Sequence, residues 1–161
     1  MNAQMNSAIG ICLTGLSALF TTTSAQAADY KIFSGTVCQP TYERNVDDIR
    51  YHDRSINNIR DFNVWVTCPV TRNNPANTNG ILQSYVRVYD APSDSWHFIC
   101  YFNTCNTSGS CRYDSDVSTN GWDWMPLKVT SNYAWGPYTV SCRIPPKSSL
   151  YHIRLGEYNT R

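Results

Sequence analysis

The sequence lacks the features that would assign it a charged partner or a structural metal. Lysine and arginine are scattered and nowhere form a run, and the formal net charge of the 161 residues is only +1. Nucleic acids and anionic membranes select clustered positive charge, so we expect neither as a partner. No Cys-x-x-Cys pair is present, and Cys105 and Cys111 are spaced too widely for a zinc knuckle. We therefore expect no cofactor.

Calcium-binding motifs are also missing, although one stretch is rich in side-chain oxygens. Asp114, Asp116 and Asp123 lie within it. An EF-hand loop that began at Asp114 would need a glycine at its sixth position and a glutamate at its twelfth, where Thr119 and Met125 stand. We interpret the stretch as a solvated polar hairpin and predict no metal site.

No serine or cysteine stands in a recognised nucleophile motif, and no pair of carboxylates has the pattern of a glycosidase. The chain has three histidines, His52, His97 and His152. A hydrolase assembled from distant residues would need His97 or His152 beside a carboxylate. The sequence therefore assigns no catalytic residue.

The first 27 residues predict a secretory signal peptide. Residues 8–20 form an apolar run that is too short for a transmembrane helix, which needs about 20 apolar residues. The Ala25-Gln26-Ala27 triplet that follows is typical of a cleavage site. We expect residues 28–161 to form one secreted or periplasmic domain without a membrane anchor.

Six of the seven cysteines follow this site, and an even number in a secreted chain indicates disulfides. Cys100 and Cys142 both lie mid-strand on apolar faces, so we pair them. Cys105 and Cys111 flank a glycine-containing loop and would close a hairpin tip, which leaves Cys38 for Cys68. The chain-entropy model gives about 4, 2.5 and 3.5 kcal/mol for these three bridges, so the domain should depend on oxidation.

No stretch after residue 27 has the sustained i, i+3, i+4, i+7 apolar spacing of an amphipathic helix. Short alternating runs lie between turn residues instead. The clearest is Tyr138–Ile144, which ends at a double proline. Pro69 should likewise end the run before it, and Asn120-Gly121 is a strong two-residue hairpin signal. The pattern predicts an all-β fold, an antiparallel β-sandwich of about eight short strands. The expected runs are 30–37, 49–52, 62–68, 81–89, 96–102, 111–117, 122–130, 138–144 and 150–155.

Several of these segments resemble a family of small secreted bacterial cysteine-containing β proteins. The similar stretches are Phe33–Pro40, Trp65–Val70, Val86–Asp90 and Tyr138–Pro146, and the similarity runs from about Lys31 to Glu157. The family is uncharacterised, so the resemblance implies a secreted β domain with two core disulfides and transfers no catalytic residue. The additional pair, Cys105 and Cys111, departs from the family's four-cysteine pattern and implies an elaborated loop.

Aromatic residues are abundant, and all five tryptophans and all eleven tyrosines follow residue 27. Trp122 and Trp124 stand two apart, so they share one face of a strand. Burial in the core is the favoured interpretation, because some of these rings must fill it. If the face is exposed, the pair forms a flat platform on which sugar rings stack through their C–H faces. Asp123 points the other way, so a neighbouring strand or loop would have to bind the hydroxyls. Tyr133 and Trp135 would extend the platform.

Aromatic excess without a catalytic motif predicts a monomeric, secreted, non-enzymatic binding module. Its partner would be a glycan or another protein, and the predicted ligand-binding residues are Trp122, Trp124, Tyr133 and Trp135. One alternative is a protease inhibitor or toxin-like effector that presents the loop between Cys105 and Cys111. A second alternative is the small secreted hydrolase.

Overall fold

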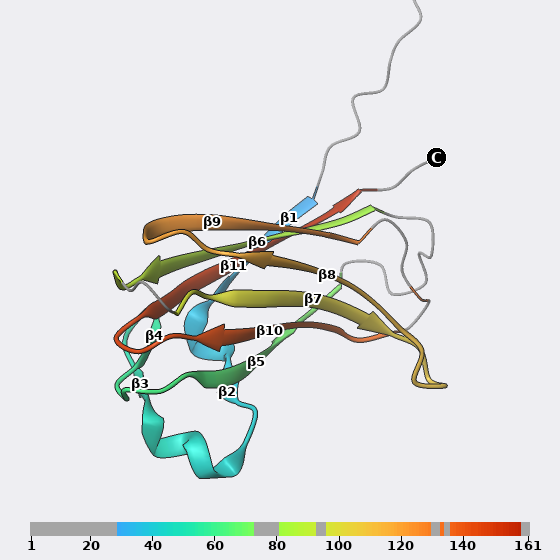
Figure 1. The fold of residues 1–161 in the computed structure, drawn as a ribbon. Coiled ribbons are helices and arrows are strands. Elements are labelled where there is room, and N and C mark those ends of the chain that lie inside the picture. Colours follow the sequence, from blue (N-terminus) through green and yellow to red (C-terminus); the bar gives the residue numbers. More distant parts are fainter. Residues whose placement is uncertain (1–28, 73–80, 93–95, 130–132, 134–135, 159–161) are drawn as a thin grey trace, which may run out of the picture.

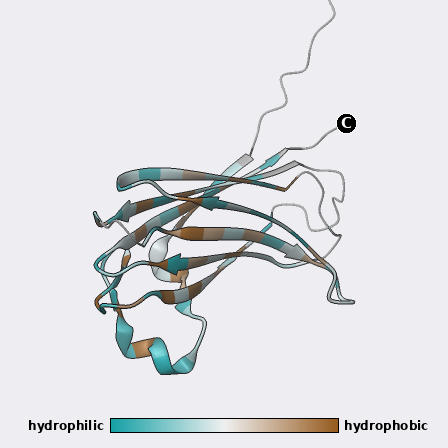
Figure 2. Cartoon of the chain, in the orientation of Figure 1, coloured by the Kyte–Doolittle hydropathy of each residue, from teal (hydrophilic) through white to brown (hydrophobic). Residues whose placement is uncertain are grey.

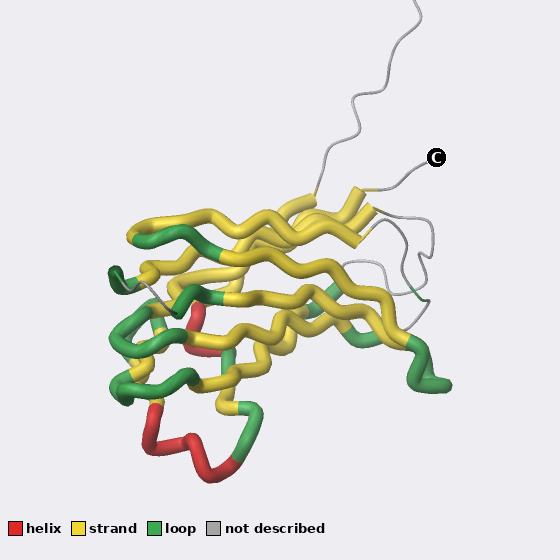
Figure 3. Tube along the Cα trace, in the orientation of Figure 1, coloured by secondary structure: helices red, strands yellow, loops and turns green. Residues whose placement is uncertain are grey.

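Alternating burial along the strands produces two antiparallel sheets that stack face to face (Figure 1). The computed structural model describes residues 29–72, 81–92, 96–129, 133 and 136–158. Two short 3-10 helices, η1 (Gly35–Val37) and η2 (Glu43–Asp48), interrupt the strands near the start of the chain (Figure 3). The predicted all-β sandwich is confirmed.

The first sheet, called sheet A here, has the strand order β3-β4-β11-β6-β9, and β1 also pairs with β11. Its strands are β1 (Asp29–Ser34), β3 (Ile49–Tyr51), β4 (Ile56–Asn58), β6 (Ile81–Asp90), β9 (Gly121–Val129) and β11 (Ser149–Tyr158). Sheet B has the order β2-β5-β10-β7-β8. Its strands are β2 (Gln39–Pro40), β5 (Val64–Val70), β7 (Ile99–Cys105), β8 (Cys111–Val117) and β10 (Tyr138–Ile144).

The core lies between the sheets and takes every second side chain from each long strand. In β10, Tyr138, Val140, Cys142 and Ile144 are buried, as the alternation predicts. Hydrophobic and hydrophilic residues accordingly follow one another along the strands in Figure 2. The strands thus have a second, outward set of side chains that the core does not use.

Two turn predictions are wrong. Pro69 lies inside β5, which continues to Val70 and pairs with β10. It is tolerated because β2 pairs with β5 only at Val66 and Thr67, so Pro69 lies where one side of the strand has no ladder partner among the described residues. Asn120-Gly121 forms no hairpin, because β8 pairs with β7 and β9 pairs with β6. The connection crosses from sheet B to sheet A, and Gly121 has a φ of 91°.

The first expected strand is also shorter than predicted. It stops at Ser34, and Gly35 begins η1. A Cβ atom at Gly35 would lie 2.3 Å from the carbonyl oxygen of Leu150, so only glycine allows this approach of the chain to β11.

All three predicted disulfides are confirmed: Cys38–Cys68, Cys100–Cys142 and Cys105–Cys111. Each lies within or next to sheet B, where Cys100 faces Cys142 across β7 and β10, and Cys105 faces Cys111 across β7 and β8. In the described part of the chain, no helix is long and apolar enough to span a bilayer.

The domain should tolerate loss of the Cys105–Cys111 bridge better than loss of Cys38–Cys68. The first pair is six residues apart and the second is 30 apart, so the constraint on the unfolded chain differs. We expect the double Cys→Ala change to lower the free energy of unfolding by about 2.5 kcal/mol at the first bridge and about 3.5 kcal/mol at the second. Urea unfolding of both variants measures this, and an equal or larger loss at Cys105–Cys111 contradicts it.

Candidate functional site

Strand β9 turns its two tryptophans away from the core. Met125, Leu127 and Val129 are buried between the sheets, and side chains alternate along a strand, so Trp122 and Trp124 point outward. They are 55% and 44% exposed. Of the two interpretations of this pair, the structure has the exposed platform and not the favoured core packing.

Strand β6 supplies the next row of side chains on the same face. Tyr89 is the cross-strand partner of Trp122, and Arg87 is the partner of Trp124. The rings of Tyr89 and Trp122 are in contact, with centroids 5.4 Å apart. Tyr85, also on β6, contacts Trp124, and the centroids of these two rings are 6.5 Å apart. The sequence signal for these residues was present, because Tyr85, Arg87 and Tyr89 occupy the outward positions of an alternating run.

Arg87 lies between the two tryptophans. Its guanidinium carbon is 4.9 Å from the ring centroid of Trp122 and 5.4 Å from that of Trp124. Such cation–π contacts fix the orientation of both indoles. A guanidinium also carries five N–H donors, so Arg87 can bind hydroxyl groups of a ligand that rests on the rings.

A β-bulge in β11 adds two more side chains. The register with β6 shifts between Leu150 and His152, which leaves Tyr151 as the extra residue. The ring of Tyr151 is 4.6 Å from that of Trp122, and the ring of His152 is 4.9 Å from that of Trp124. Simple alternation along β11 would put Tyr151 on the same face as the buried Ile153 and Leu155, and the bulge turns it to the outer face instead.

A hollow of about 240 Å³ lies beside Trp124 and is also lined by Tyr30, Tyr85 and Arg154. The guanidinium carbon of Arg154 is 3.9 Å from the ring centroid of Tyr30. We call the whole outward surface the aromatic platform. It comprises Tyr30, Tyr85, Arg87, Tyr89, Trp122, Trp124, Tyr151, His152 and Arg154.

His152 is half-buried within the platform. Burial lowers its pKa below the ordinary value, and the positive charge of Arg87 lowers this pKa further. The folded protein therefore favours the neutral imidazole, which can both donate and accept a hydrogen bond.

Of the four predicted ligand-binding residues, the structure brings two together. Tyr133 has its ring under the guanidinium of Arg112, 4.5 Å from the centroid, and its carbonyl accepts a hydrogen bond from Arg72. No ring or polar contact joins it to the platform within the described residues. Trp135 lies outside the described residues. Asp123 faces away from the tryptophans, as expected, and accepts a hydrogen bond from the Thr119 amide.

Two carboxylates of the oxygen-rich stretch, those of Asp114 and Asp123, accept hydrogen bonds from backbone amides. Asp114 accepts a hydrogen bond from the Lys128 amide at 2.6 Å. Within the described residues, no group of three or more histidine, cysteine, aspartate or glutamate side chains is placed to hold a metal ion.

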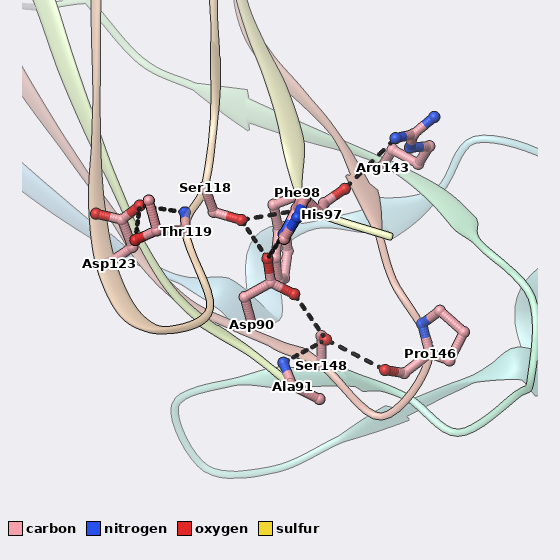
Figure 4. Close-up of polar contacts among 10 residues, drawn as sticks. All are labelled: Asp90, Ala91, His97, Phe98, Ser118, Thr119, Asp123, Arg143, Pro146 and Ser148. Carbon is pink, nitrogen blue, oxygen red and sulfur yellow. Dashed lines mark hydrogen bonds and ion pairs between the residues drawn. The ribbon is translucent and has the colours of Figure 1, made fainter. Parts of the chain in front are cut away.

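His97 does meet a carboxylate, as the hydrolase alternative requires. Its Nδ1 atom is 3.1 Å from Oδ2 of Asp90, a fully buried side chain (Figure 4). Ser118 donates to the same carboxylate oxygen, and Ser148 donates to the other at 3.4 Å. A serine nucleophile must hydrogen-bond to the imidazole, which transfers its proton. Ser118 bonds to the carboxylate instead, so this cluster is not ordered as a catalytic triad.

The Asp90 cluster has a structural role that its position explains. Asp90 ends β6, Ser118 follows β8 and Ser148 precedes β11, so the carboxylate joins three connections at one end of the sandwich. The Phe98 amide also donates to Ser118.

No family model and no curated protein matches the chain. Solved structures with a similar arrangement of strands include the C-terminal CBM6 of LamC, a laminarinase from Zobellia galactanivorans. It is 15% identical, with a TM-score of 0.48, and the match covers 79% of this chain and 98% of that one. The CBM22-1 xylan-binding domain of Xyn10C from Paenibacillus barcinonensis is 10% identical, with a TM-score of 0.46 and coverages of 87% and 90%. TmCBM61, in complex with β-1,4-galactotriose, is 9% identical, with a TM-score of 0.44 and coverages of 78% and 86%. At this level the likeness concerns the β-sandwich alone.

Replacing Asp90 with alanine should lower the free energy of unfolding by about 1–3 kcal/mol, because buried hydrogen-bonding groups of Ser118 and Ser148 would lose their acceptor. Asp53→Ala is the matched control, since Asp53 is exposed and makes no hydrogen bond within the described residues. Chemical denaturation measures both. A loss no larger than that of the control would show that the cluster does not hold the three connections together.

Acidification should destabilise the protein through His152. The unfolded chain takes up a proton near pH 6.5, and the folded protein resists it because its His152 pKa is lower. Between the folded pKa and pH 6.5 the unfolded state therefore binds more protons than the folded state. The contribution of His152 to the free energy of unfolding is fully present above pH 6.5 and is lost as the pH decreases through the folded pKa.

We expect urea midpoints at pH 7.5 and pH 5.0 to differ less in His152→Gln than in the wild type. His52→Gln, at an exposed histidine between β3 and β4, should keep the wild-type difference. The same pH dependence in all three proteins would contradict the role of His152.

Proposed function

We propose that this protein is a non-enzymatic module that binds a polysaccharide chain on the aromatic platform. One observation carries the proposal: two tryptophans of a single strand are 55% and 44% exposed on an open sheet face, and tyrosines flank them. Monomeric proteins seldom leave large apolar side chains clustered in water without a ligand or partner for them.

The platform has the two kinds of group that a sugar needs. The C–H face of a pyranose ring is apolar and packs on aromatic rings, as other apolar groups do. Its hydroxyls need hydrogen-bonding partners, which Arg87, Arg154 and His152 supply from between the rings. The surface spans β9, β6, β11 and β1, so it presents a series of contacts to an extended chain rather than one enclosed pocket.

The inhibitor alternative receives less support from the loop between Cys105 and Cys111. This loop is tightly closed, because the Asn106 side chain accepts hydrogen bonds from Ser108 and from the Ser110 amide. Its exposed residues are short polar ones, Thr107-Ser108-Gly109-Ser110. None is the basic side chain that a trypsin-like specificity pocket binds or the large apolar one that a chymotrypsin-like pocket binds.

The proposed location is outside the cytoplasm, with residues 28–161 as the mature chain. Three disulfides in a domain of this size persist in an oxidising compartment and are rare in the cytosol. Polysaccharides of cell walls and extracellular matrices are accessible from there.

Replacing Trp122 and Trp124 together with alanine should abolish retention on a polysaccharide that binds the wild type. Truncating a tryptophan that carries binding costs about 2 kcal/mol or more, and about 2 kcal/mol is a 30-fold change in Kd. Native gels that contain each of a panel of neutral polysaccharides measure the retention, and titration calorimetry then gives Kd.

Trp96→Ala is the matched control, because Trp96 is 46% exposed and lies outside the platform. Circular dichroism should show an unchanged fold in all three proteins. Equal weakening by Trp96→Ala, or full retention by a folded double variant, would refute the platform as the binding site.

A further inference from the structure

The edge of sheet B contains a second group of exposed rings, around a surface pocket of about 500 Å³. Tyr42, at the start of η2, and Phe62, just before β5, are 51% and 52% exposed, and Trp65 of β5 completes the lining. These three residues come from two separate segments of the chain. The core uses none of the three rings, since each is outside the buried set.

The polar groups of this pocket are largely uncommitted. The side chains of Asn45 and Asn63 make no hydrogen bond within the described residues, and the amide oxygen of Asn63 is buried without a partner. Such a group costs free energy unless something satisfies it. Arg60 is paired with Asp48 at 2.6 Å. Arg44 contacts the ring of Tyr42, with 5.4 Å to the centroid, and has no ion-pair partner in the described part of the chain.

The rings continue from the pocket across the outward face of sheet B. Trp65 stacks on Tyr101 of β7, with centroids 6.0 Å apart and planes at 28°. Tyr101 in turn contacts Tyr113 of β8 at 6.5 Å, and Tyr113 is 68% exposed. Together with the pocket, this line of rings forms what we call the sheet-B track.

Two arginines beside the rings of the sheet-B track, Arg44 and Arg143, form no ion pair within the described residues. Arg143 of β10 is the cross-strand partner of Trp65. One terminal nitrogen of its guanidinium donates a long hydrogen bond of 3.5 Å to the His97 carbonyl (Figure 4), and its buried Nε atom has no hydrogen-bond partner. Outward positions of β5, β10, β7 and β8 carry no aspartate or glutamate, since Asp114 and Asp116 alternate with the exposed residues of β8. Arg44 and Arg143 are thus two cations among rings, and the one carboxylate in the pocket, Asp48, is already paired.

We propose that the sheet-B track is a second binding surface and that its ligand is a polysaccharide rich in uronic acid. Sugar rings would pack on Trp65 and Tyr101, and Asn63 would meet a hydroxyl. A guanidinium matches a carboxylate geometrically, so Arg44 and Arg143 would bind the acid groups. The ligand class rests on the proposed glycan binding, but the surface is separate from the aromatic platform because it belongs to the other sheet.

The test uses native gels with polygalacturonate and, as a matched neutral polymer, its fully methyl-esterified form. The folded wild-type protein should be retarded by polygalacturonate. Trp65→Ala and Arg44→Gln should each weaken this at least tenfold, whereas the Trp122→Ala/Trp124→Ala double variant should keep it. Esterification, or 0.5 M salt, should weaken it as well, because screening reduces the attraction between exposed charges. Arg44 is exposed, so its replacement leaves the fold intact and keeps the test independent of Trp65 packing.

Three results would overturn the inference. Loss of retardation only in the Trp122→Ala/Trp124→Ala variant would assign acidic glycans to the platform and leave the proposed function standing. No retardation of the wild type would reject the acidic ligand, while binding of neutral polysaccharides would still test the platform. A dimer in sedimentation that Trp65→Ala abolishes would assign the face to a second copy of the chain.

Discussion

Everything on the outer surfaces follows from the alternation that the core imposes on each strand. Burial of Met125, Leu127 and Val129 fixes the register of β9, and Trp122 and Trp124 then have no position but the outward one. A slip of one residue would bury the tryptophans and expose the apolar residues that fill the centre of the sandwich. The exposed rings are therefore held by the same packing that stabilises the fold.

The aromatic platform acquires its shape from contacts between neighbouring strands. Cross-strand pairing sets Tyr89 beside Trp122 and Arg87 beside Trp124, and the guanidinium of Arg87 then separates the two indoles. Burial lowers the pKa of His152, and the charge of Arg87 lowers this pKa further, so the side chain that orients the rings also favours the neutral form of the adjacent imidazole. Pre-organisation of this kind reduces the conformational entropy that the side chains lose when a ligand binds.

Alternation predicted the long strands and the Cys100–Cys142 bridge, because it is a local property of the chain. The other two bridges followed from the short loop between Cys105 and Cys111 and from elimination, and the short strands β2 and β4 were not predicted. Alternation did not decide which face of β9 is buried, because each face has apolar residues. One face has Trp122 and Trp124, and the other has Met125, Leu127 and Val129. Pro126 and Lys128, which share the tryptophan face, were the available signal. The position of Tyr151 could not be read from the sequence, because a bulge depends on pairing with β6. The hairpin prediction at Asn120-Gly121 was wrong for a similar reason. A turn signal in the sequence does not show whether the two strands that it connects pair with each other.

The disulfides and the platform occupy different sheets. Sheet A contains β6 and β11, of ten residues each, and β9, of nine, so continuous ladders and core packing hold it. Sheet B ends in β2, with two residues, and in β8, which has no buried residue. These weak elements coincide with Cys38–Cys68 and Cys105–Cys111. Two of the three covalent links thus hold the edge strands of sheet B. The platform relies on backbone pairing, which a change of redox conditions does not break.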